Sequence, residues 1–96
     1  MTNCPVRFET LNDLRNFITQ TLCEREQLEI GAFPLTERIL RQRKQPIGMY
    51  FCLHGPRAVK FSAVWDALRN IVLFYGANGE RYLTTRLLQP PQSVFA

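Results

Sequence analysis

Residues 49–87 read MYFCLHGPRAVKFSAVWDALRNIVLFYGANGERYLTTRL, and this stretch decides the fold. It contains four short runs rich in aromatic and β-branched side chains, which favour strands: 49–53, 59–65, 71–75 and 82–87. The segments between the runs are rich in turn residues, and Asn78-Gly79 is a strong hairpin signal. Because connections this short cannot hold a crossover helix, neighbouring strands should be antiparallel. The stretch therefore predicts a four-stranded antiparallel meander.

The run 59–65 indicates that one face of this sheet is buried and the other faces solvent. Side chains alternate between the two faces of a strand. One face of this run would carry Val59, Phe61, Ala63 and Trp65, opposite Ala58, Lys60, Ser62 and Val64. The first set is the apolar one, so we expect it to lie in the core.

Upstream of the meander, residues 10–28 carry an apolar stripe with helical spacing. The stripe consists of Leu11, Leu14, Phe17, Ile18, Leu22 and Leu28. Thr10 followed by Asp13 resembles a capping box, which marks where the helix begins, and Gly31 and Pro34 show that it has ended before the next element. We expect this amphipathic helix to cover the inner face of the sheet.

Residues 36–43 predict a second, short helix. Thr36 would cap it, Pro46 would follow its end, and Leu35, Ile39 and Leu40 would be its inward contacts. The expected fold is thus α+β, with an N-terminal amphipathic helix and a short second helix packed on a four-stranded antiparallel meander. Residues 1–88 would form one domain and residues 89–96, with the pair Pro90-Pro91, a C-terminal tail.

Composition points to one folded domain in the cytoplasm. The chain has 96 residues, of which 46% are hydrophobic and 21% charged, enough for one hydrophobic core. No apolar run reaches the roughly 18 residues of a membrane span, and residues 1–5 do not resemble a secretion signal. The three cysteines, Cys4, Cys23 and Cys52, are widely spaced, so free thiols rather than disulfides or a metal site are expected.

The positive charge is concentrated in the middle of the chain. Residues 38–65 hold six basic side chains and no acidic one: Arg38, Arg41, Arg43, Lys44, Arg57 and Lys60. On the predicted second helix, Arg38, Arg41 and Lys44 would lie roughly on one side. Such a cluster could neutralise the phosphates of a nucleic acid or another polyanion. The alternative is a solvated basic surface without a ligand.

Two further features are candidates for function. Cys52 and His54 are two residues apart on one strand and share a face, as a thiolate–imidazolium pair or half of a metal site would require. A buried, inert cysteine is the alternative interpretation.

The second feature is an apolar patch on the sheet face that the helix leaves open, which would favour a protein partner. Its expected members are Tyr50, Val64, Val72 and Phe74.

The segment 48–57, GMYFCLHGPR, is followed by Trp65-Asp66, Arg69-Asn70, Phe74-Tyr75 and residues 79–81. With these residues the chain resembles, over about 28–83, a group of small bacterial proteins of similar length for which no activity is assigned. The resemblance implies one compact domain and transfers no functional residue.

The sequence therefore favours a small non-catalytic interaction module, without a cofactor, that binds a protein partner through the exposed sheet face. Binding of nucleic acid or another polyanion through residues 38–60 is the second possibility. A Cys/His enzyme or metal site is the third.

Overall fold

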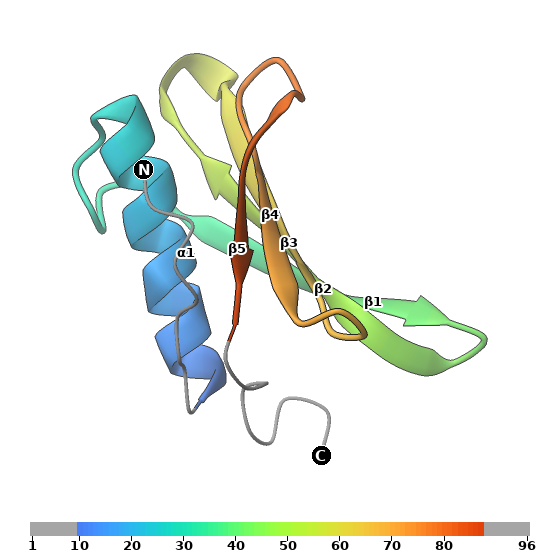
Figure 1. Ribbon diagram of the computed structural model, residues 1–96. Helices are drawn as coiled ribbons and strands as arrows, with labels where there is room; N and C mark the ends of the chain where they lie inside the picture. The colour runs from blue at the N-terminus through green and yellow to red at the C-terminus, as the bar shows by residue number, and fades with distance from the viewer. Residues whose placement is uncertain (1–9, 88–96) are drawn as a thin grey trace.

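The computed structural model describes residues 10–87 and shows an α+β fold, in which one helix packs on a five-stranded antiparallel sheet (Figure 1). The elements are α1 (Leu11–Glu26), β1 (Leu35–Gln42), β2 (Gln45–His54), the short 3-10 helix η1 (Pro56–Ala58), β3 (Lys60–Asp66), β4 (Ile71–Tyr75) and β5 (Arg81–Arg86). The strand order in the sheet follows the chain, so the sheet is a meander. The predicted tail at 89–96 and Cys4 lie outside the described residues.

Helix α1 confirms the predicted amphipathic helix and its start. The Thr10 hydroxyl accepts a hydrogen bond from the Asp13 backbone N–H at 3.1 Å, which satisfies one of the free donors of the first turn. Leu14, Ile18 and Leu22 are fully buried. The helix ends at Glu26 because Gln27 adopts the left-handed conformation, with φ 57° and ψ 40°.

The core lies between α1 and one face of the sheet. The four predicted strand runs are confirmed as β2 to β5. Of the predicted inward set, Phe61, Ala63 and Trp65 are buried, whereas Val59 precedes β3 and is only partly buried against the core. The register places Ala63 between Phe51 on β2 and Phe74 on β4, and Trp65 between Met49 and Val72, while Phe61 is opposite Leu53 on β2. A continuous apolar face therefore covers the three central strands.

Aromatic contacts attach α1 to the C-terminal half of the sheet. The Phe17 ring meets the Phe74 ring edge to face, with the centroids 5.9 Å apart. The guanidinium carbon of Arg25 lies 3.8 Å from the centre of the Tyr82 ring. Burial raises the pKa of Tyr82 to about 12. This side chain therefore stays neutral through the ordinary pH range.

The prediction of a second helix at 36–43 was wrong, and the prediction of four strands falls one strand short. Residues 35–42 form β1, which pairs with β2 along its whole length. An isolated helix of two turns is marginal in water, and this segment had only three apolar side chains to bury. Pairing with β2 satisfies its backbone groups instead. Pro46 lies opposite Arg41, where the register shifts, a place in a sheet that tolerates proline.

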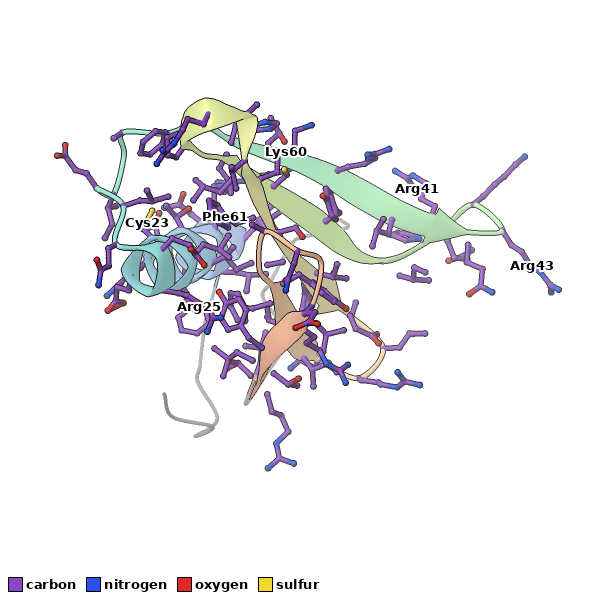
Figure 2. The ribbon with its side chains drawn as sticks, turned by 90° about the horizontal axis from the view of Figure 1, so that it is seen from above. Cys23, Arg25, Arg41, Arg43, Lys60 and Phe61 are labelled. Carbon is purple, nitrogen blue, oxygen red and sulfur yellow. The ribbon has the colours of Figure 1, made fainter. Side chains whose placement is uncertain are left out.

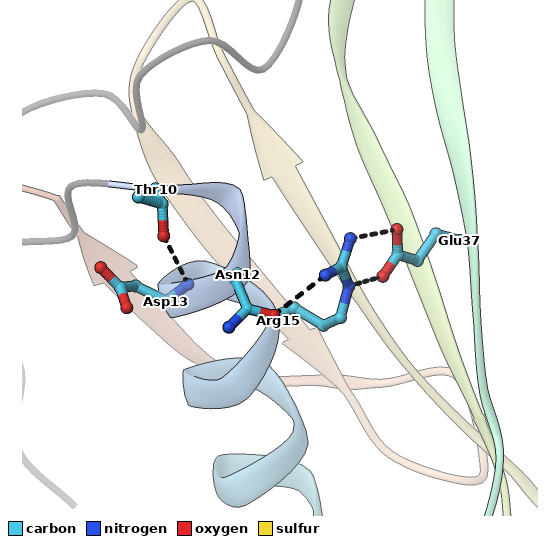
Figure 3. A network of polar contacts seen from close by, with 5 residues as sticks. All are labelled: Thr10, Asn12, Asp13, Arg15 and Glu37. Carbon is cyan, nitrogen blue, oxygen red and sulfur yellow. Dashed lines mark hydrogen bonds and ion pairs between the residues drawn. The ribbon is translucent and has the colours of Figure 1, made fainter.

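Two hydrogen bonds tie β1 to the helix. The Arg15 guanidinium donates to both carboxylate oxygens of Glu37, from Nε to Oε2 and from Nη2 to Oε1, and its Nη1 also donates to Asn12 (Figure 3). The hydrogen bond to Glu37 is the main cause of the raised pKa of Arg15. The forked geometry of this pair fixes orientation as well as distance. Strand β1 is thus held over the first turns of α1.

The turn between β1 and β2 consists of Arg43 and Lys44. Their φ angles are 52° and 68°, both in the left-handed region that a two-residue type I′ hairpin turn requires. Arginine and lysine rarely adopt this region, because their Cβ atoms make the left-handed backbone conformation about 1 kcal/mol or more less favourable.

Replacing Arg43 and Lys44 together with Asn and Gly should therefore stabilise the protein, by about 1 kcal/mol in the free energy of unfolding. Urea denaturation, followed by the fluorescence of Trp65, measures the change. The control is an Arg43→Gln/Lys44→Gln variant, which removes the same charges but keeps the strain. Equal stability of the two double variants would contradict this account of the turn.

Candidate functional site

The candidate site is the sheet face that α1 leaves open. Side chains on this face follow from the register: they alternate with the buried set and come from all five strands. Its central members are Tyr50, Cys52, Ser62, Val64, Leu73 and Tyr75, with Arg38, Lys60 and Arg86 toward its margins. We call this surface the open face.

Of the four residues predicted to form an exposed apolar patch, two do not lie on the open face. Tyr50 and Val64 are half-buried on the open face. The placement of Val72 and Phe74 was wrong, because both are fully buried beneath α1. Their neighbours Ile71, Leu73 and Tyr75 occupy the open face in their place. Every residue of this run is apolar or aromatic, so alternation alone could not tell which set faces the helix.

One end of the open face is hollowed into a groove of about 270 Å³, which we call the apolar groove. Its apolar lining comes from four strands and the β3–β4 turn: Leu40, Ile47, Val64, Leu68 and Leu73. Gly48 stands between Leu40 and Asp66, two residues of this lining, in the register. A Cβ at Gly48 would collide with the backbone carbonyl of Trp65, so glycine is required there.

The β3–β4 turn presents Leu68 at the rim of this groove. One carboxylate oxygen of Asp66 accepts hydrogen bonds from the backbone N–H groups of Leu68 and Arg69, at 3.0 and 3.2 Å. The other oxygen lies 3.6 Å from the Arg69 guanidinium. Asn70 accepts from the Trp65 indole at 3.2 Å and anchors the end of the turn. Leu68, 79% exposed, is therefore held outward by a turn with its own hydrogen bonds.

The other end of the open face is more polar. The Arg38 guanidinium lies 5.9 Å from the centre of the Tyr50 ring, within the range of a cation–π contact. Burial, followed by the neighbouring Cys52 thiol, raises the pKa of Tyr50. Tyr50 therefore stays neutral at ordinary pH, and its ring joins the apolar groove to the basic margin formed by Arg38.

The structure places Cys52 and His54 on the same face, as predicted, but gives them different partners. Cys52 is 4% exposed. His54 Nε2 lies 2.9 Å from the Thr36 hydroxyl, within hydrogen-bond distance. Within residues 10–87, no group of three or more His, Cys, Asp or Glu side chains is arranged to hold a metal ion.

The six basic residues of segment 38–60 spread along the sheet. Arg43 and Lys44 form the tip of the β1–β2 hairpin, whereas Arg57 lies in the turn beyond the opposite end of β2. Figure 2 shows Arg43 and Lys60 at opposite ends of the hairpin. The expectation that Arg38, Arg41 and Lys44 share one helical side was wrong, because β1 is a strand. Arg38 and Lys60 are the two that the register puts on the open face.

Charge is unevenly distributed along the chain. Residues 10–37, which include α1, hold two basic and five acidic side chains, whereas residues 38–87 hold nine basic and two acidic. Of the two acidic residues in 38–87, Asp66 is occupied by its own turn. Glu37 of β1, just before this range, is paired with Arg15 of the helix. The open face carries Arg38, Lys60 and Arg86 against the single carboxylate of Asp66, so positive charge predominates among these side chains.

Comparison with protein-family models, with curated proteins and with solved structures finds no match to this chain. The resemblance to small bacterial proteins therefore stays a prediction. In the described part of the chain, α1 is too short and too polar to cross a membrane.

The burial of Cys52 leads to a test of whether its thiol is reactive. In a Cys4→Ser/Cys23→Ser variant, which retains only Cys52, we expect iodoacetamide to modify the folded protein at least about tenfold more slowly than the urea-unfolded protein, because the thiol is covered. Mass spectrometry of timed samples gives both rates, and free cysteine is the reference. Modification of the folded protein faster than of free cysteine would instead indicate an activated thiolate and favour the enzyme hypothesis.

Proposed function

We propose that this protein is a non-catalytic interaction module whose open face binds an acidic segment of a partner protein. The observation that carries the proposal is the apolar groove, an opening between apolar side chains in a positively charged surface. A partner segment with one or two apolar side chains flanked by Asp or Glu fits both properties.

The apolar part of the proposal rests on Leu68 and its neighbours. An exposed leucine is ordinary when it stands alone. Leu68 instead lines a groove with Leu73 and Val64, and its turn is held in place by Asp66. Contiguous apolar surface of this kind is a frequent feature of protein-binding sites, and a pre-ordered rim lowers the entropy lost on binding.

The acidic part of the proposal rests on the margins of the groove. Arg38 is two residues before Leu40 on β1 and shares its face, Arg86 is opposite Ile71 in the register, and Arg69 lines the groove itself. Positive side chains at the rim of an apolar site increase the rate of association with an acidic partner and disfavour basic ones. Asp66 also lines the groove, but its carboxylate is engaged by the backbone of its own turn and by Arg69.

The non-catalytic part rests on the two residues that could carry chemistry. A nucleophilic thiol must reach its substrate, and Cys52 is covered. A general base must be available for proton transfer, whereas the His54 ring is engaged with Thr36. Both arrangements favour a structural role for this pair.

Selection of a random peptide library on the immobilised protein should enrich peptides with Leu, Ile or Phe next to Asp or Glu. A selected peptide should bind Leu73→Glu at least about tenfold more weakly, because this change removes an apolar contact and adds a like charge. Fluorescence anisotropy of the labelled peptide measures the affinity.

The matched control is Asn16→Glu, which adds the same charge on the exposed side of α1. It should bind the peptide like the wild type, and thermal melts of both variants should show folded protein. The proposal fails if the enriched peptides lack acidic residues, or if Leu73→Glu and Asn16→Glu bind equally well.

A second candidate function, binding of single-stranded nucleic acid, is favoured by the pairing of aromatic and basic residues on the open face. Tyr50 and Tyr75 could stack on bases, while Arg38 and Lys60 could contact phosphates. Their positions on one face support this arrangement.

If this second function holds, affinity for a labelled single-stranded oligonucleotide should fall with salt, and the log–log slope should decrease by about 1.4 in an Arg38→Ala/Lys60→Ala variant, about 0.7 per lost phosphate contact. An Arg43→Ala/Lys44→Ala variant has the same net charge and should change the slope less. Absence of binding at low salt would exclude this candidate and leave the peptide proposal unaffected.

A further inference from the structure

We propose that the free edge of β1 pairs with the β1 edge of a second copy of this chain. The two strands would run antiparallel about a two-fold axis at Ile39 and join two sheets into one continuous sheet. This inference does not depend on the proposed function. It rests on the backbone groups, the side chains and the position of β1.

Within residues 10–87, β1 is an edge strand, and every second residue directs backbone groups away from β2 toward an edge that no other strand of this part of the chain covers. The His54 N–H donates to the Pro34 carbonyl at 2.9 Å, which makes Pro34 and His54 a hydrogen-bonded pair. Hydrogen-bonded and non-hydrogen-bonded pairs alternate along β1 and β2 from this pair onward. Thr36 and Arg38 consequently direct their backbone groups toward β2. Leu35, Glu37 and Ile39 direct theirs toward the free edge, where a further strand can pair with them.

In one register, the side chains of β1 complement those of β1 in the second copy. With the axis at Ile39, this residue stands opposite Ile39 of the second copy, and Glu37 stands opposite Arg41. Ile39 is 38% exposed, one of few large apolar side chains so exposed within residues 10–87. The dimer would therefore cover an apolar side chain twice and form two Glu–Arg pairs. Arg15 already holds Glu37 in place, so little side-chain entropy is lost.

The same charges disfavour a neighbouring register. The backbone groups that point outward from one copy face those of the other copy only when the two-fold axis passes through a residue, not between two residues. An axis at Arg38 would put two arginines directly opposite, which is destabilising. An axis at Leu40 would put Glu37 opposite Arg43, which lies in the hairpin turn beyond β1 and is not in strand conformation. Charged residues usually protect an edge strand from pairing, but here their order along β1 is self-complementary at Ile39.

The position of β1 leaves this edge accessible. In Figure 1 the β1–β2 hairpin extends beyond α1, and β1 is the outermost strand at that side of the sheet. A two-fold axis perpendicular to the sheet would place both copies of α1 on the same side and the two open faces on the other. Leu40 of the apolar groove would then stand opposite Arg38 of the second copy, which adds a basic residue to each groove.

Sedimentation velocity of the full-length protein over a range of concentrations tests the inference. We expect the mass to rise from the 11.2 kDa of the monomer toward twice that value. Ile39→Pro should abolish the dimer but keep the fold, because the Ile39 N–H points to the free edge, and proline is tolerated on edges. Ile39→Val, which keeps the N–H and the strand preference, is the matched control and should dimerise.

Arg41→Glu provides an independent test if Ile39→Pro fails to fold. It should raise the dissociation constant of the dimer at least about tenfold, because Glu37 would then face a like charge in both pairs. A monomer at all concentrations up to about 1 mM would overturn the inference. A dimer that Arg41→Glu leaves unchanged would also overturn it and place the interface elsewhere.

Discussion

Burial of the α1 stripe against a single face of the sheet is the constraint on which the rest of the structure depends. Leu14, Ile18 and Leu22 have no exposed surface, and Trp65, Phe51 and Phe74 are covered with them. At about 25 cal/mol per Å² of apolar surface removed from water, this contact supplies the main favourable energy for a small domain. One helix can cover only one face, so the same contact leaves the other face open.

The shape and charge of the open face, which suit it to binding, follow from local features of the strands and of the β3–β4 turn. Gly48 is needed for the close approach of β2 to β3, because a Cβ there would collide with the Trp65 carbonyl. Asp66 satisfies the β3–β4 turn and thereby directs Leu68 outward. The acidic residues of the α1 region lie away from this face. A surface that is apolar in the middle and basic at its margins results from these independent causes.

Elements with a local signal could be predicted from the sequence, and those stabilised by distant pairing could not. The run 71–75 coincides with β4, and Thr10 caps α1 as expected. For residues 35–42, a capping threonine and three apolar residues favoured a helix, but pairing with β2 decided the outcome. The candidate site was affected in the same way: Tyr50 and Val64 were placed correctly, whereas Val72 and Phe74 were assigned to the wrong face.

The sequence by itself determined the amphipathic helix, four of the strands, the antiparallel connections and the excess of positive charge after residue 37, because each of these depends on residues close together in the chain. The tertiary structure alone decided that β1 is a strand, which face of β4 is buried, and that Leu40, Leu68 and Leu73 meet in one groove. These features depend on which strands become neighbours. Which strands become neighbours depends on the burial of apolar surface and on backbone pairing between residues far apart in the sequence. A local sequence pattern contains no information on either.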